Sequence, residues 1–318
     1  MVYNLDVKDK KILTLLDENC RYTNTQIAKR VKLSKPAVEA RIQKLIKNNI
    51  IFAFYTELDV TKLGYYLYKV YYKFQNISRE KENEISEFWK ENKFCIWSGK
   101  VRSRWDLAVT VLARNNNQLG IILKEFQLKY SGYILEKDIL LIEYTPIYSR
   151  EHLVNTLKKE LTITQSEKII ILDETDKKIL KTISNNARMQ IVGIVKNTKL
   201  TKDVVIYRLK KLKELISSYR CYPNLGLIGV NLYKLILRTR NLSFEKEIAI
   251  KGYCKEHKKI TQFLKLVGSW DVEIEIEVED ENELYKIIDE IRKEFNDVIR
   301  DYDILRVTET YKYDYYPF

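Results

Sequence analysis

The chain has 318 residues, of which 45% are hydrophobic and 31% are charged, which is typical of folded domains and excludes a disordered chain. No apolar run approaches 18 residues and no basic, apolar leader opens the chain, so we expect a soluble cytoplasmic protein with no membrane contact. Its net charge is +12. Its four cysteines are widely spaced and lack a Cys-x-x-Cys pair, so we expect neither a metal site nor a disulfide framework. We also expect no cofactor.

The predicted elements begin with a helix over residues 5–18. Asp6 can cap its first turn, and Ile12, Leu13 and Leu16 form one apolar stripe at helical spacing. The stripe predicts that this helix packs against others by a single face.

Two further helices are predicted before residue 50. Thr23-x-x-Gln26 has the form of a capping box and opens a short helix that ends near Val31. Ser34 can cap a longer third helix, which tolerates Pro36 in its first turn. A short helix and a longer one joined by a tight turn, with a basic outer face on the longer, predict a helix-turn-helix.

Residues 50–57 are rich in Ile, Phe and Tyr and are expected to form the strands of a small wing. After them, the predicted order is strand, helix, strand, strand, helix, strand, which indicates a ferredoxin-like α/β sandwich. The predicted elements are a strand at 65–74, a helix at 78–92, a hairpin of 95–101 and 105–112, a helix at 116–129 and a strand at 133–144.

The whole pattern occurs twice. Residues 5–45 and 172–212 are identical at 18 of 41 positions at a constant shift of 167, and the sandwiches match at a shift of 165. We therefore predict an α+β protein of two homologous units whose sandwiches pair within one chain. The predicted domains are a winged helix-turn-helix at 1–60, a sandwich at 61–150, a linker at 151–171, a second winged helix-turn-helix at 172–225 and a second sandwich at 226–318.

The positive charge lies on the helix-turn-helix copies. Residues 1–55 carry 11 Lys/Arg against 5 Asp/Glu, and residues 172–222 carry 12 against 5, whereas the rest of the chain sums to −1. This distribution suits a phosphate-binding surface, although charge alone also fits a solvated basic face with no function.

The helix motifs, together with a Trp-Asp turn in the sandwich, resemble the leucine-responsive/asparagine-responsive (Lrp/AsnC) transcription regulators over nearly the whole chain. The motifs are Leu5-Asp6-x-x-Asp9-x-x-Ile12-Leu13 and Leu33-Ser34-x-x-x-Val38-x-x-Arg41-Ile42-x-x-Leu45. The resemblance implies double-stranded DNA as partner, a sandwich that dimerises and senses an amino-acid-like effector, and further association of the tandem pseudo-dimer.

The resemblance also implies which residues contact DNA. Arg41 and Arg208 have a structural alternative, pairing with an acidic residue of the first helix. The implied DNA-contact residues are Ser34, Lys35, Glu39, Arg41, Gln43 and Lys44 in copy one and Thr201, Lys202, Ile206, Arg208, Lys210 and Lys211 in copy two.

An effector would contact the Trp-Asp turns. Copy two keeps a glycine there, in Gly268-Ser269-Trp270-Asp271, whereas copy one has Ser103-Arg104-Trp105-Asp106. We therefore expect effector binding at Gly268, Trp270 and Asp271, with Asp106 as the copy-one counterpart. Packing in the core is the alternative for both tryptophans.

Two other functions stay open. The chain also resembles the siroheme decarboxylases, Lrp-like enzymes that work as pairs or fused chains and carry histidine in the sandwich hairpin. Here the only histidines are His152, in the linker, and His257, at a helix end, and we expect surface or capping roles for both. The third possibility is a ligand-sensing or assembly protein whose helix-turn-helix no longer touches DNA, against which the charge of the two copies argues.

Overall fold

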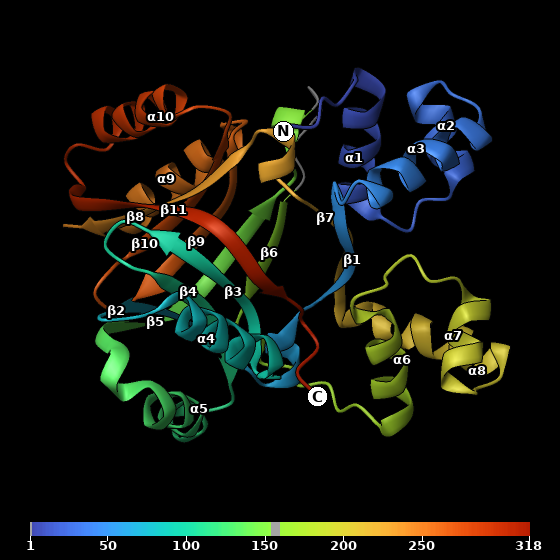
Figure 1. Ribbon diagram of the computed structural model, residues 1–318, viewed down its shortest axis with the longest axis horizontal. Coiled ribbons are helices and arrows are strands. Elements are labelled where there is room, and N and C mark those ends of the chain that lie inside the picture. The colour runs from blue at the N-terminus through green and yellow to red at the C-terminus, as the bar shows by residue number, and fades with distance from the viewer. Residues whose placement is uncertain (1, 154–159) are drawn as a thin grey trace.

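The computed structural model describes residues 2–153 and 160–318 (Figure 1). Copy one contains α1 (Val7–Asn19), α2 (Asn24–Val31), α3 (Lys35–Lys47), β1 (Ile51–Leu58), β2 (Tyr66–Phe74), α4 (Arg79–Glu91), β3 (Cys95–Arg102), β4 (Leu107–Ala113), α5 (Asn116–Tyr130) and β5 (Ile134–Tyr148). After β6 (Glu160–Thr164), copy two contains α6 (Glu174–Ser184), α7 (Ile191–Thr198), α8 (Lys202–Lys211), β7 (Ile216–Pro223), β8 (Asn231–Thr239), α9 (Phe244–Glu256), β9 (Ile260–Val267), β10 (Val272–Val278), α10 (Glu281–Glu294) and β11 (Ile299–Tyr313).

The predicted caps start the first three helices. Asp6 accepts hydrogen bonds from two backbone N–H groups of α1, and Thr23 and Gln26 form the reciprocal capping box of α2. Ser34 accepts from the backbone of Ala37 at 3.3 Å, in the first turn of α3. The two helix-turn-helix units are therefore built by local signals that the sequence carries.

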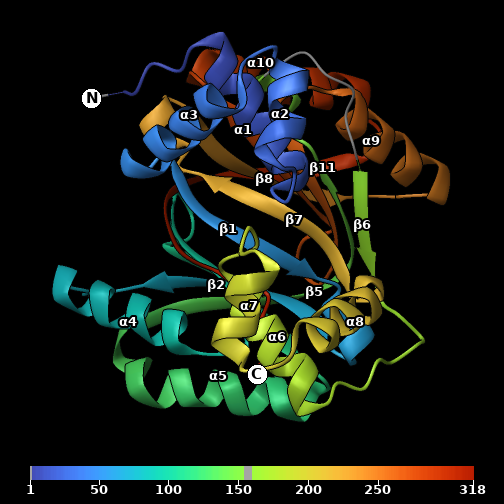
Figure 2. The ribbon, with the colours of Figure 1, turned by 90° about the vertical axis from the view of Figure 1, so that its right-hand side faces the viewer.

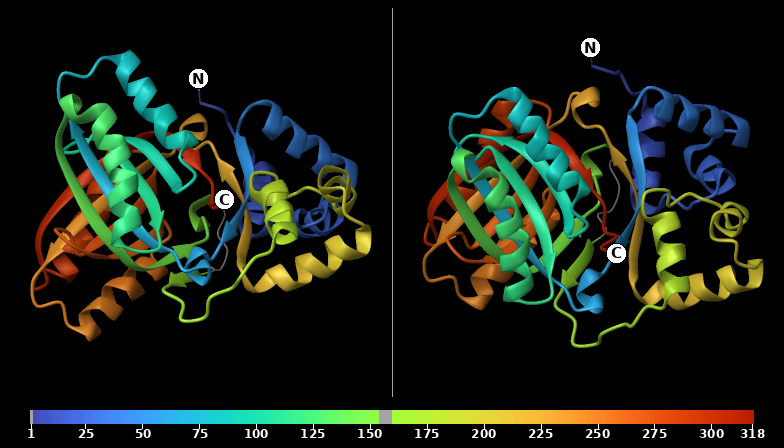
Figure 3. Two further views of the ribbon diagram at one scale, coloured as in Figure 1. Left: turned by 90° about the horizontal axis from the view of Figure 1, so that it is seen from below. Right: turned by 60° about the horizontal axis from the view of Figure 1, so that its bottom comes forward.

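The two sandwiches join into one closed barrel. Its eight strands follow the order β2-β4-β3-β11-β8-β10-β9-β5, and β5 pairs with β2 to close the ring. Each copy contributes four neighbouring strands, and the antiparallel pairs β3–β11 and β5–β9 join the copies. The helices α4, α5, α9 and α10 lie outside the barrel (Figures 1 and 3). The predicted ferredoxin-like fold and the pairing of the copies are thus present.

Because helices cover the outside of the barrel, the strands β2, β4, β8 and β10 are buried on both faces along most of their length. In β2, Val70 and Tyr72 pack toward the helices, whereas Lys69 and Tyr71 alternate with them and face the barrel interior. In β10, Ile274 and Ile276 pack toward the helices of copy two. The alternating glutamates of β10 therefore face the interior, where a one-sided sheet would expose them to solvent.

The residues predicted to form the strands of a wing pair with the other copy. Residues 51–58 form one strand, β1, which pairs with β7 of the other copy in a two-stranded antiparallel ribbon. Tyr55 lies opposite Arg220 in this ribbon. A wing formed within one unit needs a turn that pairs two neighbouring strands as a hairpin. Here β1 and β7 are each a single strand, and each pairs with the other, about half the chain away.

The predicted linker also differs. Residues 160–164 form β6, which pairs antiparallel with the end of β5. Residues 154–159 of the predicted linker lie outside the described residues. The strand β5 runs to Tyr148, four residues beyond its predicted end, because β6 and β9 offer it partners there. The connection between the copies is thus partly built into the sheet.

Candidate nucleic-acid interface

Helix α3 presents a polar, basic face to solvent. Its buried side is Val38, Ile42 and Leu45, which pack in the core of the first helix-turn-helix. The predicted contact residues on the opposite side are all exposed, namely Ser34, Lys35, Glu39, Gln43 and Lys44. The spacing of the apolar residues thus leaves the others free to meet a groove of DNA.

Helix α8 presents a different face. Thr201 caps it by accepting from the backbone of Val204 at 3.4 Å. Ile206 is half-buried, and Tyr207, which occupies the position of Ala40 in copy one, is 66% exposed. Of the predicted contacts, Thr201, Lys202, Lys210 and Lys211 are exposed. The second recognition helix therefore combines lysines with an exposed aromatic ring.

The structure gives Arg41 and Arg208 the structural role that the sequence left open. Arg41 Nη1 lies 2.6 Å from Asp6 Oδ2 and 2.7 Å from Asp9 Oδ1, and the bonds from the two carboxylates raise the pKa of Arg41. Arg208 pairs in the same way with Asp173 and Asp176. These arginines brace the recognition helices against the first helix of each unit.

The β1–β7 ribbon holds the two recognition helices on one side of the molecule. Figure 2 shows the ribbon running between the two units, with α3 and α8 at opposite ends of the same face. Each unit attaches to the strand of the other copy, because Cys20 N donates to Tyr219 O at 2.7 Å and Ala187 N donates to Phe54 O at 2.9 Å. The spacing of the two helices is therefore set by the folded ribbon.

Two arginines cross between the units. Arg21 Nη2 donates to the carbonyl of Met189 at 2.9 Å, and Arg188 Nη1 donates to the carbonyl of Cys20 at 2.6 Å. The sequence analysis did not assign them a role. The sequence did carry one signal for them: Arg21 and Arg188 are identical residues at the 167-residue shift.

The Trp-Asp turns carry structural contacts of their own. Gly268 has a φ of 151°, and a Cβ there would lie 2.5 Å from Cδ2 of the buried Leu140, so conformation and packing together favour glycine. Asp271 Oδ2 accepts from the backbone N–H of Thr239 at 2.6 Å, and Asp106 Oδ2 accepts from that of Phe74 at 2.9 Å. Trp270 is buried, as is its counterpart Trp105. These contacts explain the residues without a ligand, and effector binding at the turns stays a prediction.

The two turns predict opposite responses to substitution. Ser103 has a φ of 136°, which favours glycine, and its side chain is exposed. Ser103→Gly should therefore raise the free energy of unfolding by about 0.5 to 1 kcal/mol, whereas Gly268→Ala should lower it by more than 1 kcal/mol. Urea unfolding of both variants checks this, and a destabilised Ser103→Gly protein would contradict it.

The barrel interior holds a buried cluster of charges. Lys234 Nζ lies 2.7 Å from Glu273 Oε1, and Lys69 Nζ lies 3.4 Å from the same oxygen. Lys234 also pairs with Glu275. Both ammonium groups lie over the ring of Trp97, at 4.7 and 4.9 Å from its centroid. The match of Lys69 with Lys234 in the repeat was the sequence signal for this cluster.

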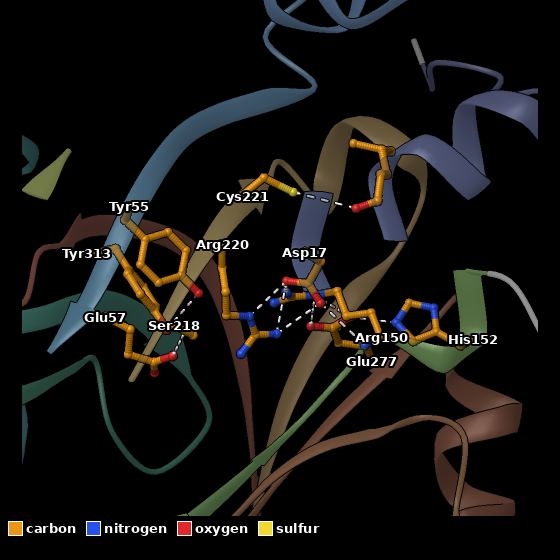
Figure 4. Close-up of polar contacts among 11 residues, drawn as sticks. Asp17, Tyr55, Glu57, Arg150, His152, Ser218, Arg220, Cys221, Glu277 and Tyr313 are labelled. Atoms are coloured by element: carbon orange, nitrogen blue, oxygen red, sulfur yellow. Dashed lines mark hydrogen bonds and ion pairs between the residues drawn. The ribbon is translucent and has the colours of Figure 1, made fainter. Parts of the chain in front are cut away.

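A second buried network ties the first helix-turn-helix to the barrel (Figure 4). Asp17, in α1, accepts from Arg150 Nη1 at 2.8 Å and from Arg220 Nη2 at 2.9 Å. Arg150 Nε also donates to Glu277 of β10 at 3.0 Å, and His152 Nε2 lies 2.6 Å from that carboxylate. The expected surface role of His152 is thus wrong, because Glu277 holds its ring in the interior.

The positions that match this network in the opposite copies are not charged. Ser184 occupies the position of Asp17, and Tyr55, Tyr315 and Leu112 occupy those of Arg220, Arg150 and Glu277. There, Tyr55 and Tyr315 pack with parallel rings at 6.5 Å between centroids. Ion pairs therefore attach one helix-turn-helix to the barrel, while aromatic packing attaches the other.

The described residues contain few features of other site classes. In residues 2–153 and 160–318, no group of three or more His, Cys, Asp or Glu side chains is arranged to hold a metal ion. Within the same ranges, no helix has the length and apolar content needed to cross a membrane. The four cysteines are buried.

A protein-family model described as "Winged helix-turn-helix DNA-binding" matches the chain twice, at residues 5–51 and 172–215. The chain is 44% identical over 57 residues to the HTH-type transcriptional regulator LysM of Saccharolobus solfataricus and 39% identical over 77 residues to LrpA of Bacillus subtilis. These alignments cover 18% and 24% of this chain and only 40% and 54% of those proteins. An alignment to FL11 of Pyrococcus furiosus covers 37% of this chain and 79% of that regulator, at 26% identity.

The chain also resembles a solved structure over almost its entire length. The crystal structure of the siroheme decarboxylase NirDL aligns over 96% of this chain and 92% of its own, with a TM-score of 0.61 and 14% identity. At that identity, the match shows a shared fold.

The repeats, the fold and these matches define a tandem winged helix-turn-helix protein with two ferredoxin-like sandwiches. The chain carries two units that match the winged helix-turn-helix model, and its sequence relatives include HTH-type transcriptional regulators such as LrpA.

Proposed function

We propose that this protein is a sequence-specific DNA-binding transcription regulator that acts as a covalent pseudo-dimer. The observation that carries the proposal is the presentation of α3 and α8 on the same side of the molecule by the β1–β7 ribbon (Figure 2). Two helices held in this way suit two successive turns of the major groove. Regulation by a small molecule and association of several pseudo-dimers are further parts of the proposal.

The charge on the interface supports DNA as the partner. Lys35 and Lys44 in α3, and Lys202, Lys210 and Lys211 in α8, are exposed on the recognition helices. Because Arg41 and Arg208 are held in ion pairs, the exposed lysines are the groups available for phosphates and bases.

Selection of bound sequences from a random DNA pool with the full chain tests the proposal directly. On a selected site, affinity should fall by about three to five orders of magnitude between roughly 50 and 200 mM salt, as expected for about 6 to 10 phosphate contacts. Lys35→Ala should weaken binding at every salt concentration, whereas Lys124→Ala, an exposed lysine on α5, should not. Fluorescence anisotropy measures both. A pool without enrichment, or a flat salt response, would reject DNA as the partner.

The whole-chain match to NirDL supports a second candidate, a siroheme-modifying enzyme. The enclosed barrel cavity has a volume of about 70 Å³, well below the roughly 300 to 1,000 Å³ of pockets that hold drug-sized ligands. Wider and more open pockets of about 400 to 580 Å³ lie elsewhere, so the cavity volume argues against a tetrapyrrole site only inside the barrel. Titration with siroheme separates the two, because a saturable change of the chromophore spectrum would support the enzyme.

A further inference from the structure

The cavity of about 70 Å³ lies between the barrel interior and the β1–β7 ribbon. Strands of both copies line it, together with Tyr55 of β1 and Arg220 of β7. A water molecule needs roughly 10 to 15 Å³ of such space, so about five non-hydrogen atoms fit. The cavity is thus large enough for a small molecule and too small for a large one.

The polar groups that line the cavity are only partly satisfied. Thr261 is 4% exposed, and its hydroxyl has no hydrogen-bond partner within the described parts of the chain. Arg220 uses Nε and Nη2 to hold Asp17, while its remaining nitrogen, Nη1, points away from Asp17 in Figure 4. A buried hydroxyl without a partner costs stability, so a ligand that accepted from it would be favoured.

The charged groups that line the cavity are mainly hydrogen-bond donors. Three of the four charged residues that line the cavity are cations, Lys69, Arg150 and Arg220, and the fourth is Glu275. Lys69 has one ion-pair contact, at 3.4 Å, and burial lowers its pKa to about 8, only partly offset by Glu273. An additional negative charge beside it would be stabilised.

We propose that this cavity is a binding site for a small oxyanion, a carboxylate or phosphate of about five non-hydrogen atoms, held by Arg220, Lys69 and the Thr261 hydroxyl. Arg220 and Arg150 also hold Asp17 at the end of α1, so an occupant that draws on these arginines changes how the first helix-turn-helix is anchored. This coupling rests on the proposed DNA binding, whereas the site itself does not.

The test is thermal unfolding of the full chain in sodium acetate, sodium phosphate or sodium chloride at equal ionic strength. Acetate or phosphate should raise the Tm saturably, by roughly 5 °C at a hundredfold excess over Kd, and the active probe identifies the ligand as carboxylate or phosphate. Without ligand, Thr261→Val should unfold at the same Tm as the unmodified protein or above it, because the lost hydroxyl has no partner. It should bind the active probe at least about tenfold more weakly.

Thr308→Val, at an exposed position of β11 outside the cavity, is the matched control and should keep the full shift. Equal shifts for Thr261→Val and the unmodified protein would place the ion elsewhere and overturn the proposal, as would no shift with either probe. If DNA binding is established, saturating ligand should change DNA affinity in the unmodified protein and not in Thr261→Val. An unchanged DNA affinity would contradict the coupling to DNA binding but would not contradict the oxyanion site itself.

Discussion

Glu273→Gln is expected to lower the free energy of unfolding by about 3 to 5 kcal/mol, because it leaves the buried ammonium groups of Lys69 and Lys234 without their shared carboxylate. Glu279→Gln, just beyond β10 and exposed, should change it by less than about 0.5 kcal/mol. Urea unfolding of both variants at pH 7 measures the difference. A loss below about 1 kcal/mol for Glu273→Gln would show that the ion pairs do not hold the barrel.

The same variant should alter the acid sensitivity of the protein. Burial raises the pKa of Glu273, but the ion pairs with Lys234 and Lys69 outweigh it and bring the pKa down to about 2 from a usual 4.5. A carboxylate with a lowered pKa stabilises the fold above its usual pKa, and this contribution is lost as the pH falls toward 2. The stability difference between the unmodified protein and Glu273→Gln should therefore shrink between pH 5 and 2. A constant difference would exclude titration of Glu273 as its origin.

The buried charges also specify which copies pair. Copy one has Ala108 at the position of Glu273, so a barrel of two first copies would bury two Lys69 side chains with no matching glutamate. A barrel of two second copies would instead bury an excess of glutamates from two β10 strands. Each arrangement leaves unpaired charge in a low-dielectric interior, which favours the pairing of unlike copies.

Gln43→Ala is expected to relax base preference in one half of the DNA site only, by a factor of roughly 5 to 150 at the base pair that Gln43 reads. The reason is that Lys210 occupies the matching position in copy two, and Ile206 that of Glu39. Gln pairs well with adenine and Lys with guanine, whereas Ile makes only apolar contacts. Lys210→Ala should relax the opposite half.

Binding to a selected site with every base pair substituted in turn measures this asymmetry. Lys124→Ala again serves as the control, since it should leave both halves unchanged. A palindromic site, with both halves equally sensitive to Gln43→Ala, would mean that two chains bind through identical copies and would contradict the proposed pseudo-dimer.

The sequence by itself determined the local elements and the tandem organisation. The Asp6, Thr23 and Ser34 caps and the stripe of Ile12, Leu13 and Leu16 act between residues only a few positions apart, so they can be read directly. The 167-residue repeat allowed the same helices to be predicted in copy two. The exposed face of each recognition helix followed from the same periodicity.

Only the tertiary structure decided the contacts between the copies. The sequence predicted a local wing where β1 pairs with β7, and it assigned His152 to the surface where Glu277 holds it in the interior. The glutamates of β10 alternate with apolar residues in a pattern that ordinarily faces solvent, but barrel closure buries both faces. The cost of burying a carboxylate depends on its neighbours, and the cations that offset it come from strands far away in the chain. Local patterns therefore predicted which elements form, while long-range pairing decided which of their faces became interior.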